Sequence, residues 1–300
     1  MSNLSAPHFH NEEAAYAYVE KRLWPQGPVC PHCGGVERIS KMQGKSTRVG
    51  AYKCYQCRKP FTVKIGTIFE DSKVPMRVWL QAMYLIAGSK KGISSNQLHR
   101  ILGVTLKTAW FMSHRIREAM NTDDGAPLGG LGLTVEADET FIGREPGMEH
   151  RPKAFWHKMK VVALVERGSG RSRAFVVDGV SIPQLQPILL ANVHPLSKLN
   201  TDEAAPYKSI GRFFYRHETV RHQSGEYVRG GVHSNTIEGY FSIFKRGMKG
   251  VYQHCAKKHL HRYVAEFNFR YTNRSAIGVE DTERADLMLR GAIGKRLKYA

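Results

Sequence analysis

No stretch of this 300-residue sequence approaches the roughly 18 consecutive apolar residues that a membrane-spanning helix requires. The first residues also lack the basic region followed by an apolar region that marks a secretory signal peptide. These two absences disfavour a membrane partner and a secreted protein. We therefore expect a cytoplasmic protein.

Cysteine is scarce, with five residues, and an odd number cannot all pair in disulfides. Four of the five lie in two Cys-x-x-Cys pairs, which is typical of a metal site and not of the disulfide framework of a small secreted protein. The fifth, Cys255, is expected to be a spare thiol without a catalytic role.

Acidic residues are also in the minority, with 26 Asp and Glu against 45 Lys and Arg, which gives a net charge of +19. A balance this basic indicates a polyanionic partner, and nucleic acid is the first candidate. Hydrophobic residues make up 42% of the chain, which is enough to form buried cores, and the length suggests two or three structural units.

Apolar and turn-forming residues divide the chain into successive segments, with no internal repeat. We predict an N-terminal helical segment at 1–28, the cysteine pairs among short strands at 29–70, and helices at 71–121. A polar, Gly-rich linker at 121–130 follows. Residues 276–300 are expected to form a C-terminal tail.

Between the linker and the tail, residues 131–275 combine strand-like alternation with helical spacing. Such an order of strands and helices predicts an α/β domain with a mixed sheet. The expected strands are 133–142, 161–166, 174–180 and 198–202, and the expected helical regions are 183–192 and 235–273, the latter broken near Lys249.

Two Cys-x-x-Cys motifs, at Cys30 and Cys33 and at Cys54 and Cys57, are separated by twenty residues. Two residues between thiolates allow one turn to bring both sulfurs to a single ion, and two such turns complete a tetrahedral shell of four thiolates. The spacing predicts a structural zinc ribbon with no position left for water. Reduced structural cysteines or redox pairs are the alternative, which the lack of a surrounding thioredoxin-like βαβ pattern disfavours.

The segment after the ribbon has the order helix, Gly-containing turn, helix, by which a second helix enters the major groove of DNA. Helices are expected at 76–87, 97–102 and 105–119, with Ser94 or Ser95 capping the second. A plain helical bundle with a solvated basic face is the alternative, but the ribbon and the net charge favour DNA binding. Exposed side chains expected to contact DNA here are Lys107, Ser113, His114, Arg115 and Arg117, and the later helical region adds Arg246 and Lys249.

Three acidic residues stand where strands and a helix could bring them together. Asp138 lies in the first strand of the α/β domain, Asp202 ends a later strand, and Glu238 begins a helix, with 35 residues between Asp202 and Glu238. Carboxylates so arranged can hold two magnesium or manganese ions for phosphoryl transfer, whereas surface acids without function are the alternative. Chemistry alone does not separate Asp138 from Glu136 and Glu139, although strand alternation puts Glu136 on its face and Glu139 on the other.

Two more residues share a helical face with Glu238. Lys245 lies two turns later and could hold a phosphate beside the metals. Asn235 lies three residues earlier and could be a ligand or a DNA contact.

Together the motifs resemble the insertion-sequence transposases of the ISXO-like group, which carry an N-terminal zinc ribbon. The resemblance spans about Phe9 to Arg274, and its last two motifs are the most specific. The matching stretches are Cys-Pro-His-Cys-Gly at 30–34, Lys-Thr-Ala-Trp-Phe-Met-Ser-His-Arg-Ile-Arg at 107–117, Val-Glu-Ala-Asp-Glu-Thr-Phe-Ile-Gly at 135–143, Thr-Asp-Glu at 201–203 and His-Ser-Asn-Thr-Ile-Glu-Gly-Tyr-Phe-Ser-Ile-Phe-Lys-Arg-Gly at 233–247.

This resemblance implies an RNase H-like DDE catalytic domain that recognises terminal inverted repeats and catalyses metal-dependent DNA strand cleavage and strand transfer. It places the first two catalytic acids at Asp138 and Asp202. The third is Glu238 or Asn235, and Glu238 is preferred for its charge and its interval from Asp202. The implied partners are the inverted repeats and target DNA, with a homo-oligomer assembled on DNA and association with the nucleoid while bound.

Two other functions are consistent with the same motifs. One is a DNA-binding regulator without catalytic activity that derives from a transposase, although the intact acids argue against it. The other is an RNase H-like nuclease without strand transfer. If Asp138 is the catalytic acid, its neighbours Glu136 and Glu139 should tolerate replacement by glutamine.

Overall fold

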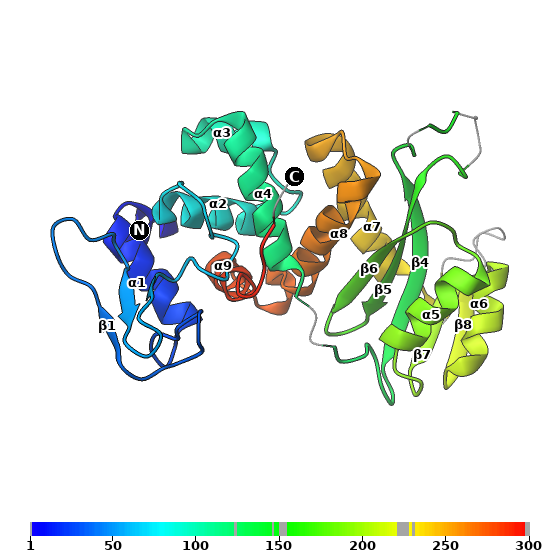
Figure 1. Cartoon of the computed structure of the whole chain (residues 1–300). Coiled ribbons are helices and arrows are strands. Elements are labelled where there is room, and N and C mark those ends of the chain that lie inside the picture. The colour runs from blue at the N-terminus through cyan, green and yellow to red at the C-terminus, as the bar shows by residue number, and fades with distance from the viewer. Residues whose placement is uncertain are drawn as a thin grey trace. The chain divides into compact units, whose positions relative to one another are not determined.

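The chain divides into two compact units (Figure 1). Unit 1 comprises Met1–Thr122 and Val279–Ala300, and unit 2 comprises Asp123–Gly278. None of the described helices is long and apolar enough to cross a membrane. The computed structural model describes residues 2–122, 125–145, 147–149, 155–220, 228–229 and 232–297, so that Asp123 and Asp124 of the predicted linker lie outside the described residues.

Unit 1 begins with two short 3-10 helices, η1 (Asn3–Ser5) and η2 (Pro7–Phe9), and with the helix α1 (Glu12–Leu23). The Asn11 side chain caps α1 by accepting a hydrogen bond from the N–H of Ala14 at 2.8 Å. Acidic residues in the first turn of α1 and basic residues in its last turn suit the helix dipole.

A small antiparallel sheet follows, in which β2 (Tyr52–Cys54) lies between β1 (Ile39–Lys41) and β3 (Pro60–Phe61). The rings of Tyr52 and Phe61 stack at 5.8 Å, and Trp24 packs edge-on against both. These aromatic side chains form the apolar part of a core that also contains buried cysteines.

All three helices expected after the ribbon are present: α2 (Met76–Gly88), α3 (Ser95–Leu102) and α4 (Leu106–Met120). Ser94 caps α3 by accepting from the N–H of Gln97 at 3.1 Å. Thr105 caps α4 in the same way, through the N–H of Thr108 at 3.2 Å. Between α3 and α4, Gly103 has a φ of 65°, the left-handed conformation that ends a helix and that glycine adopts without strain.

The last described residues form a helix and not the expected tail. After the short turn η6 (Ser275–Ile277), the helix α9 (Asp281–Arg290) packs against α2 within unit 1 (Figure 1). Met288 and Leu289 are fully buried there, and Arg284 donates to the carbonyl of Ala87 at 3.0 Å. The sequence did not predict that α9 contributes to the core, because most of its residues are polar and only one narrow side of the helix is apolar.

Unit 2 contains a five-stranded mixed sheet with the order β6-β5-β4-β7-β8. The first three strands pair antiparallel, whereas β7 and β8 run parallel to β4. This confirms the predicted α/β domain with a mixed sheet. The strands are β4 (Thr134–Ile142), β5 (Met159–Glu166), β6 (Ser172–Val177), β7 (Lys198–Asp202) and β8 (Arg216–Val220), and a separate short pair is β9 (Val228–Arg229) with β10 (Val232–His233).

Helices cover both faces of the sheet (Figure 1). Val161, Ala163 and Val165 of β5 pack against α7 and α8, and alternate residues such as Val162 and Leu164 pack against α5 and α6. Burial on both faces explains the almost unbroken apolar run of β5. The helices are α5 (Ile182–Asn192), α6 (Ala205–Ile210) with the turn η3 (Gly211–Phe213), α7 (Asn235–Gly247) with the π-helical turn η5 (Met248–Tyr252), and α8 (Lys257–Thr272).

Part of the expected linker belongs to the core of unit 2. Leu128 is 1% exposed, and its N–H donates to the carbonyl of Asn192 at 2.7 Å. Leu128 and Val193 also form an isolated parallel bridge. The domain predicted to begin at residue 131 therefore includes residues that precede it.

Candidate metal centres and active site

The four cysteines of the two predicted knuckles come together in unit 1. Their sulfur atoms all lie within 4.8 Å of one another, with Cys30 and Cys57 3.6 Å apart and Cys33 and Cys54 3.7 Å apart. Four sulfurs at about 2.3 Å from a zinc ion, in tetrahedral directions, would lie about 3.8 Å from one another. The geometry therefore supports the predicted structural zinc site.

Both knuckles are built in the same way. The residue after the second cysteine of each, Gly34 or Arg58, has a positive φ of 73° or 62°. In the second knuckle, hydrogen bonds from the backbone of Cys57 and of Gln56 together lower the pKa of the Cys54 thiol to about 7, against the opposite effect of burial. A lowered pKa favours the thiolate, which is the form that binds zinc.

The prediction that α4 presents a row of exposed basic side chains is wrong. His114, Arg115 and Arg117 are buried, with exposed fractions of 0%, 5% and 2%. Arg115 donates to the carbonyls of Ile68 and Glu70, both at 2.7 Å, so that it ties α4 to the segment after the ribbon.

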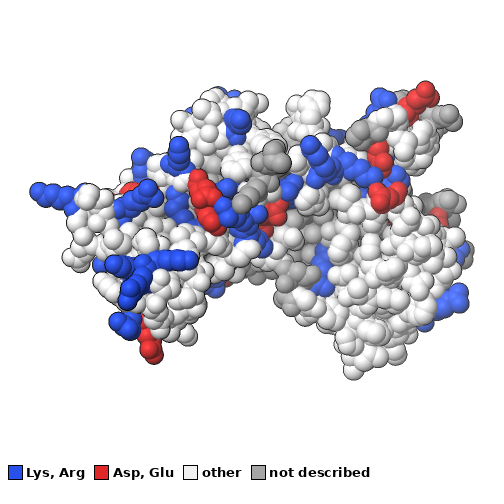
Figure 2. All heavy atoms as spheres, in the orientation of Figure 1, with Lys and Arg blue, Asp and Glu red and all other residues white. Residues whose placement is uncertain are grey.

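The other buried side chains of this row are also engaged inside unit 1. Arg117 donates to the hydroxyl of Ser113 at 3.1 Å, and the His114 ring packs on Trp110. Lys107, at the beginning of α4, is exposed as expected. Further Lys and Arg side chains are scattered over the face of unit 1 that Figure 2 shows, with fewer acidic side chains among them.

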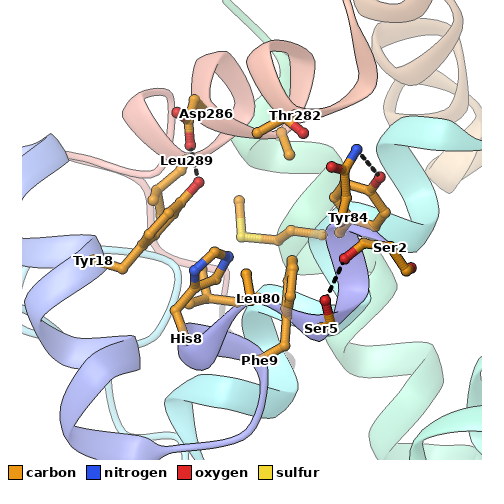
Figure 3. Close-up of a pocket in the computed structure, with 14 residues that line it drawn as sticks. Ser2, Ser5, His8, Phe9, Tyr18, Leu80, Tyr84, Thr282, Asp286 and Leu289 are labelled. Carbon is orange, nitrogen blue, oxygen red and sulfur yellow. Dashed lines mark hydrogen bonds between the residues drawn. The ribbon is translucent and has the colours of Figure 1, made fainter.

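Unit 1 also contains a pocket of about 310 Å³, lined by its first residues, α2 and α9 (Figure 3). The polar groups there bond to one another: the Tyr18 hydroxyl donates to Asp286 at 2.6 Å, and the His8 ring stacks on Tyr18 at 3.8 Å. None of the predicted site residues lines this pocket.

In unit 2, the sheet brings Asp138 and Asp202 to neighbouring positions. The parallel ladder of β4 and β7 pairs Glu136 with Asn200, and each aspartate follows two residues later on its own strand. Residues in register on adjacent strands lie about 4.8 Å apart. The pairing of β4 with β7 ends at Glu136 and Asn200, although β4 still pairs with β5 and β7 with β8 beyond that point. The two aspartates therefore lie just past the last hydrogen-bonded pair of β4 and β7.

The electrostatic surroundings of Asp138 show the same proximity. Burial, together with the carboxylates of Glu139 and Asp202, raises the pKa of Asp138 to about 7, whereas Lys245 acts in the opposite direction. The sheet and α7 therefore place Asp202 and Lys245 near Asp138.

Sequence reasoning missed a tyrosine at this site. The hydroxyl of Tyr207, in α6, donates to Glu139 at 2.7 Å. Burial and the nearby Glu139, Asp138 and Asp202 carboxylates raise the pKa of Tyr207. Its only signal in the sequence is its place five residues after Asp202, in the short helix that follows β7.

The face of α7 behaves as its spacing predicted. Asn235, Glu238 and Lys245 are exposed, whereas Ile237 and Phe244 are buried in the core below. The Glu238 carboxylate accepts from the hydroxyl of Ser234 at 2.8 Å. Among the described residues, no cluster of acids holds all its ligand atoms within 4.8 Å, so Glu238 is not gathered with the two aspartates as tightly as the cysteines are with one another.

The donor set fits a hard divalent cation. Burial raises the pKa of Asp138 and of Glu139, and the nearby Asp202 carboxylate raises both further because like charges lie close together. A doubly charged cation would relieve this repulsion, and carboxylate oxygens are the ligands that magnesium and manganese prefer.

Comparisons with known proteins agree with this architecture. Residues 127–272 match the family model described as ISXO2-like transposase domain, and residues 10–60 match the one described as transposase zinc-ribbon domain. The chain therefore contains two segments similar to domains of transposases, and these matches confirm the resemblance seen in its motifs. A relative from Halobacterium salinarum, named as an uncharacterized protein in transposable element ISH50, is 27% identical over 277 residues, which cover 87% of this chain and 91% of the relative.

Two solved structures are also similar. One is the simian T-cell lymphotropic virus intasome in complex with PP2A regulatory subunit B56 gamma, at 15% identity and a TM-score of 0.29, covering 57% of this chain and 63% of that one, so this chain spans less than two thirds of its length. The other is the HTLV-2 integrase catalytic core domain in complex with magnesium, at 13% identity and a TM-score of 0.27, covering 46% of this chain and 84% of that one.

Proposed function

We propose that this protein is a DNA transposase that binds the ends of an insertion sequence and catalyses metal-dependent strand cleavage and strand transfer. The observation that carries the proposal is the parallel pairing of Glu136 in β4 with Asn200 in β7, two residues before Asp138 and Asp202, in a segment that matches a transposase domain model. The mutual electrostatic influence of the two carboxylates supports the same conclusion.

In the proposed site, Asp138 and Asp202 hold two magnesium or manganese ions together with one residue of α7. When bound, such a pair of ions activates the attacking oxygen and stabilises the leaving oxygen of a phosphodiester. The third ligand is Glu238 or Asn235, and the charge of Glu238 favours it. Lys245, an exposed cation near Asp138, would hold a phosphate of the DNA beside the carboxylates.

DNA recognition is proposed for the ribbon, the helix-turn-helix and the basic side chains that remain exposed. Of the predicted DNA contacts, the exposed ones are Lys107 in α4, Arg246 in α7 and Lys249 in η5. The proposed partners are terminal inverted repeats and target DNA, on which copies of the chain would assemble. His114, Arg115 and Arg117 are buried and do not belong to this surface.

The test uses purified full-length protein and duplexes that carry the ends of the element found in the DNA flanking the gene. Asp138→Asn and Asp202→Asn should each reduce magnesium-dependent cleavage by orders of magnitude, since each removes a ligand charge, while end binding stays near that of the wild type. Cys255→Ser is the matched control. Cleavage that survives in either aspartate variant contradicts the proposal.

Two outcomes would point to the other functions. Specific end binding without any metal-dependent cleavage by the wild-type protein would identify a regulator. Cleavage without joined products after target DNA is added would identify a nuclease that lacks strand transfer.

A further inference from the structure

Glu136, on the same face of β4 as Asp138, carries a second carboxylate, and this one is completely buried. Glu136 is 0% exposed, two residues before Asp138. One of its oxygens accepts a hydrogen bond from Nε of Arg167. The other accepts from the backbone N–H of Ile237, in the first turn of α7, at 2.9 Å.

Arg167 extends this contact to the residue before the helix. Its guanidinium donates to the carbonyl of His233, and its backbone N–H donates to the carbonyl of Thr134 at 2.9 Å. Nδ2 of Asn200, in β7, lies 3.4 Å from the same carbonyl of His233. The beginning of α7 is thus attached to β4, to β7 and to the turn after β5.

The attached turn is the one that presents the candidate third ligand. Asn235 lies two residues before Ile237 and Glu238 directly follows it, and the N–H of Ile237 donates to Glu136. A buried ion pair contributes little net stability, because desolvation offsets most of the attraction, but its hydrogen bonds have fixed directions. A carboxylate at a helix N-terminus also matches the partial positive charge there.

We propose that the Glu136–Arg167 pair positions the first turn of α7 so that its metal ligand faces Asp138 and Asp202. This inference rests on the proposed function. Glu136 acts here as a positioning residue and not as a ligand, since both of its oxygens are occupied by Arg167 and Ile237. The proposal replaces the expectation that Glu136 tolerates glutamine.

The experiment measures manganese binding to the zinc-loaded full-length protein by electron paramagnetic resonance, without DNA. Glu136→Gln keeps the size of the side chain and one acceptor but loses the charge opposite Arg167. Loss of a residue that orients a ligand typically weakens metal binding about 10- to 100-fold, and that is the result expected here. Magnesium-dependent cleavage should fall in parallel, with unchanged binding of end DNA.

A matched control separates positioning from stability. Glu266 and Arg270 form another ion pair in unit 2, 2.9 Å apart within α8, and Glu266 also accepts from the hydroxyl of Tyr252 in η5. Glu266→Gln should lower the unfolding temperature about as much as Glu136→Gln but leave manganese affinity unchanged. If Glu136→Gln also binds manganese as the wild type does, the pair is only structural and the proposal is overturned.

A second variant keeps the proposal testable if Glu136→Gln does not fold. Arg167→Lys retains the positive charge but has no planar fork to reach Glu136 and His233 together. It should weaken manganese binding in the same direction, and wild-type affinity in this variant overturns the proposal. Absence of manganese binding by the wild-type protein would instead refute the proposed metal site itself, before any substitution is made.

Discussion

At Asp138, burial and two neighbouring carboxylates act in the same direction. The folded protein raises the pKa of this group to about 7 from an ordinary value of 3.8. A raised pKa means that the folded state binds the proton more tightly than the unfolded chain does. The metal-free protein therefore loses stability as the pH rises from about 4 to about 7, and this loss is complete above the folded pKa.

This gives a test by thermal unfolding of zinc-loaded protein without magnesium. The unfolding temperature of the wild type should decline between pH 5 and 7 more than that of Asp138→Asn, in which the titrating group is absent. Added magnesium should raise the unfolding temperature more at pH 8 than at pH 5, because the ion binds the ionised carboxylate. Equal pH slopes for the two proteins would show that Asp138 is not the group responsible.

The third ligand is decided by comparing two substitutions on one helical face. Glu238→Gln should lose cleavage to the same extent as Asp138→Asn, by orders of magnitude, because it too removes a metal-binding charge. Asn235→Ala should be milder. The measurement is the rate of magnesium-dependent cleavage at saturating DNA, and the opposite order of the two losses would assign the ligand to Asn235.

Individual residues also show where the sequence stops being informative. Alternation along β4 predicted that Glu136 and Asp138 share a face and that Glu139 lies on the other. It did not predict that Glu136 would be neutralised by Arg167, because a partner 31 residues away is set by the tertiary fold and not by local pattern. Tyr207 was missed for the same reason.

Among the secondary-structure elements, prediction succeeded where burial follows a simple period. The strand Lys198–Asp202 was predicted with its observed bounds, and the helix–turn–helix order was correct. The edge strand β8 was missed because Arg216 and Glu218 give it no apolar alternation. The basic side chains of α4 were predicted to be exposed. Arg115 is instead buried because it binds the carbonyls of residues 68 and 70, which lie outside the helix.

The zinc ribbon is expected to depend on its metal. Cys54→Ser removes one of four ligands, so bound zinc should fall toward zero and the β1–β3 sheet should lose its order, since small zinc modules gain their folding free energy from the ion. Zinc is measured by mass spectrometry of the purified protein, with Cys255→Ser as the control. Normal specific DNA binding by a zinc-free Cys54→Ser protein would contradict a role of the ribbon in recognition.

For the whole molecule, a net charge of +19 predicts DNA binding that depends strongly on salt. Contacts between Lys or Arg and phosphates release counterions, so affinity should fall steeply as the salt concentration rises from about 50 to 200 mM. Lys249→Ala removes an exposed cation and should reduce the slope of log affinity against log salt by about one. Arg115→Lys, at a buried position, should leave that slope unchanged, and a flat salt dependence of the wild type would leave the charge unexplained.

The C-terminal helix should stabilise unit 1 and not unit 2. Leu289 is 1% exposed in α9, so Leu289→Ala should cost about 2–5 kcal/mol of unfolding free energy. In a denaturant titration followed by hydrogen exchange, protection should fall in α2 and α9, while β4 and β5 keep theirs. A uniform loss across both units would show that they unfold together.

The return of α9 to unit 1 also has a genetic consequence. The coding sequence for unit 2, the proposed catalytic domain, lies inside that of the unit that contains the ribbon, because Met1–Thr122 and Val279–Ala300 form one compact body. A frameshift or stop codon shortly before codon 279 would spare every candidate catalytic codon and still disrupt the core of unit 1. We expect such late-truncated copies to be defective in recognising DNA ends while their acidic residues remain intact, so that an inventory of catalytic codons would misclassify them as active.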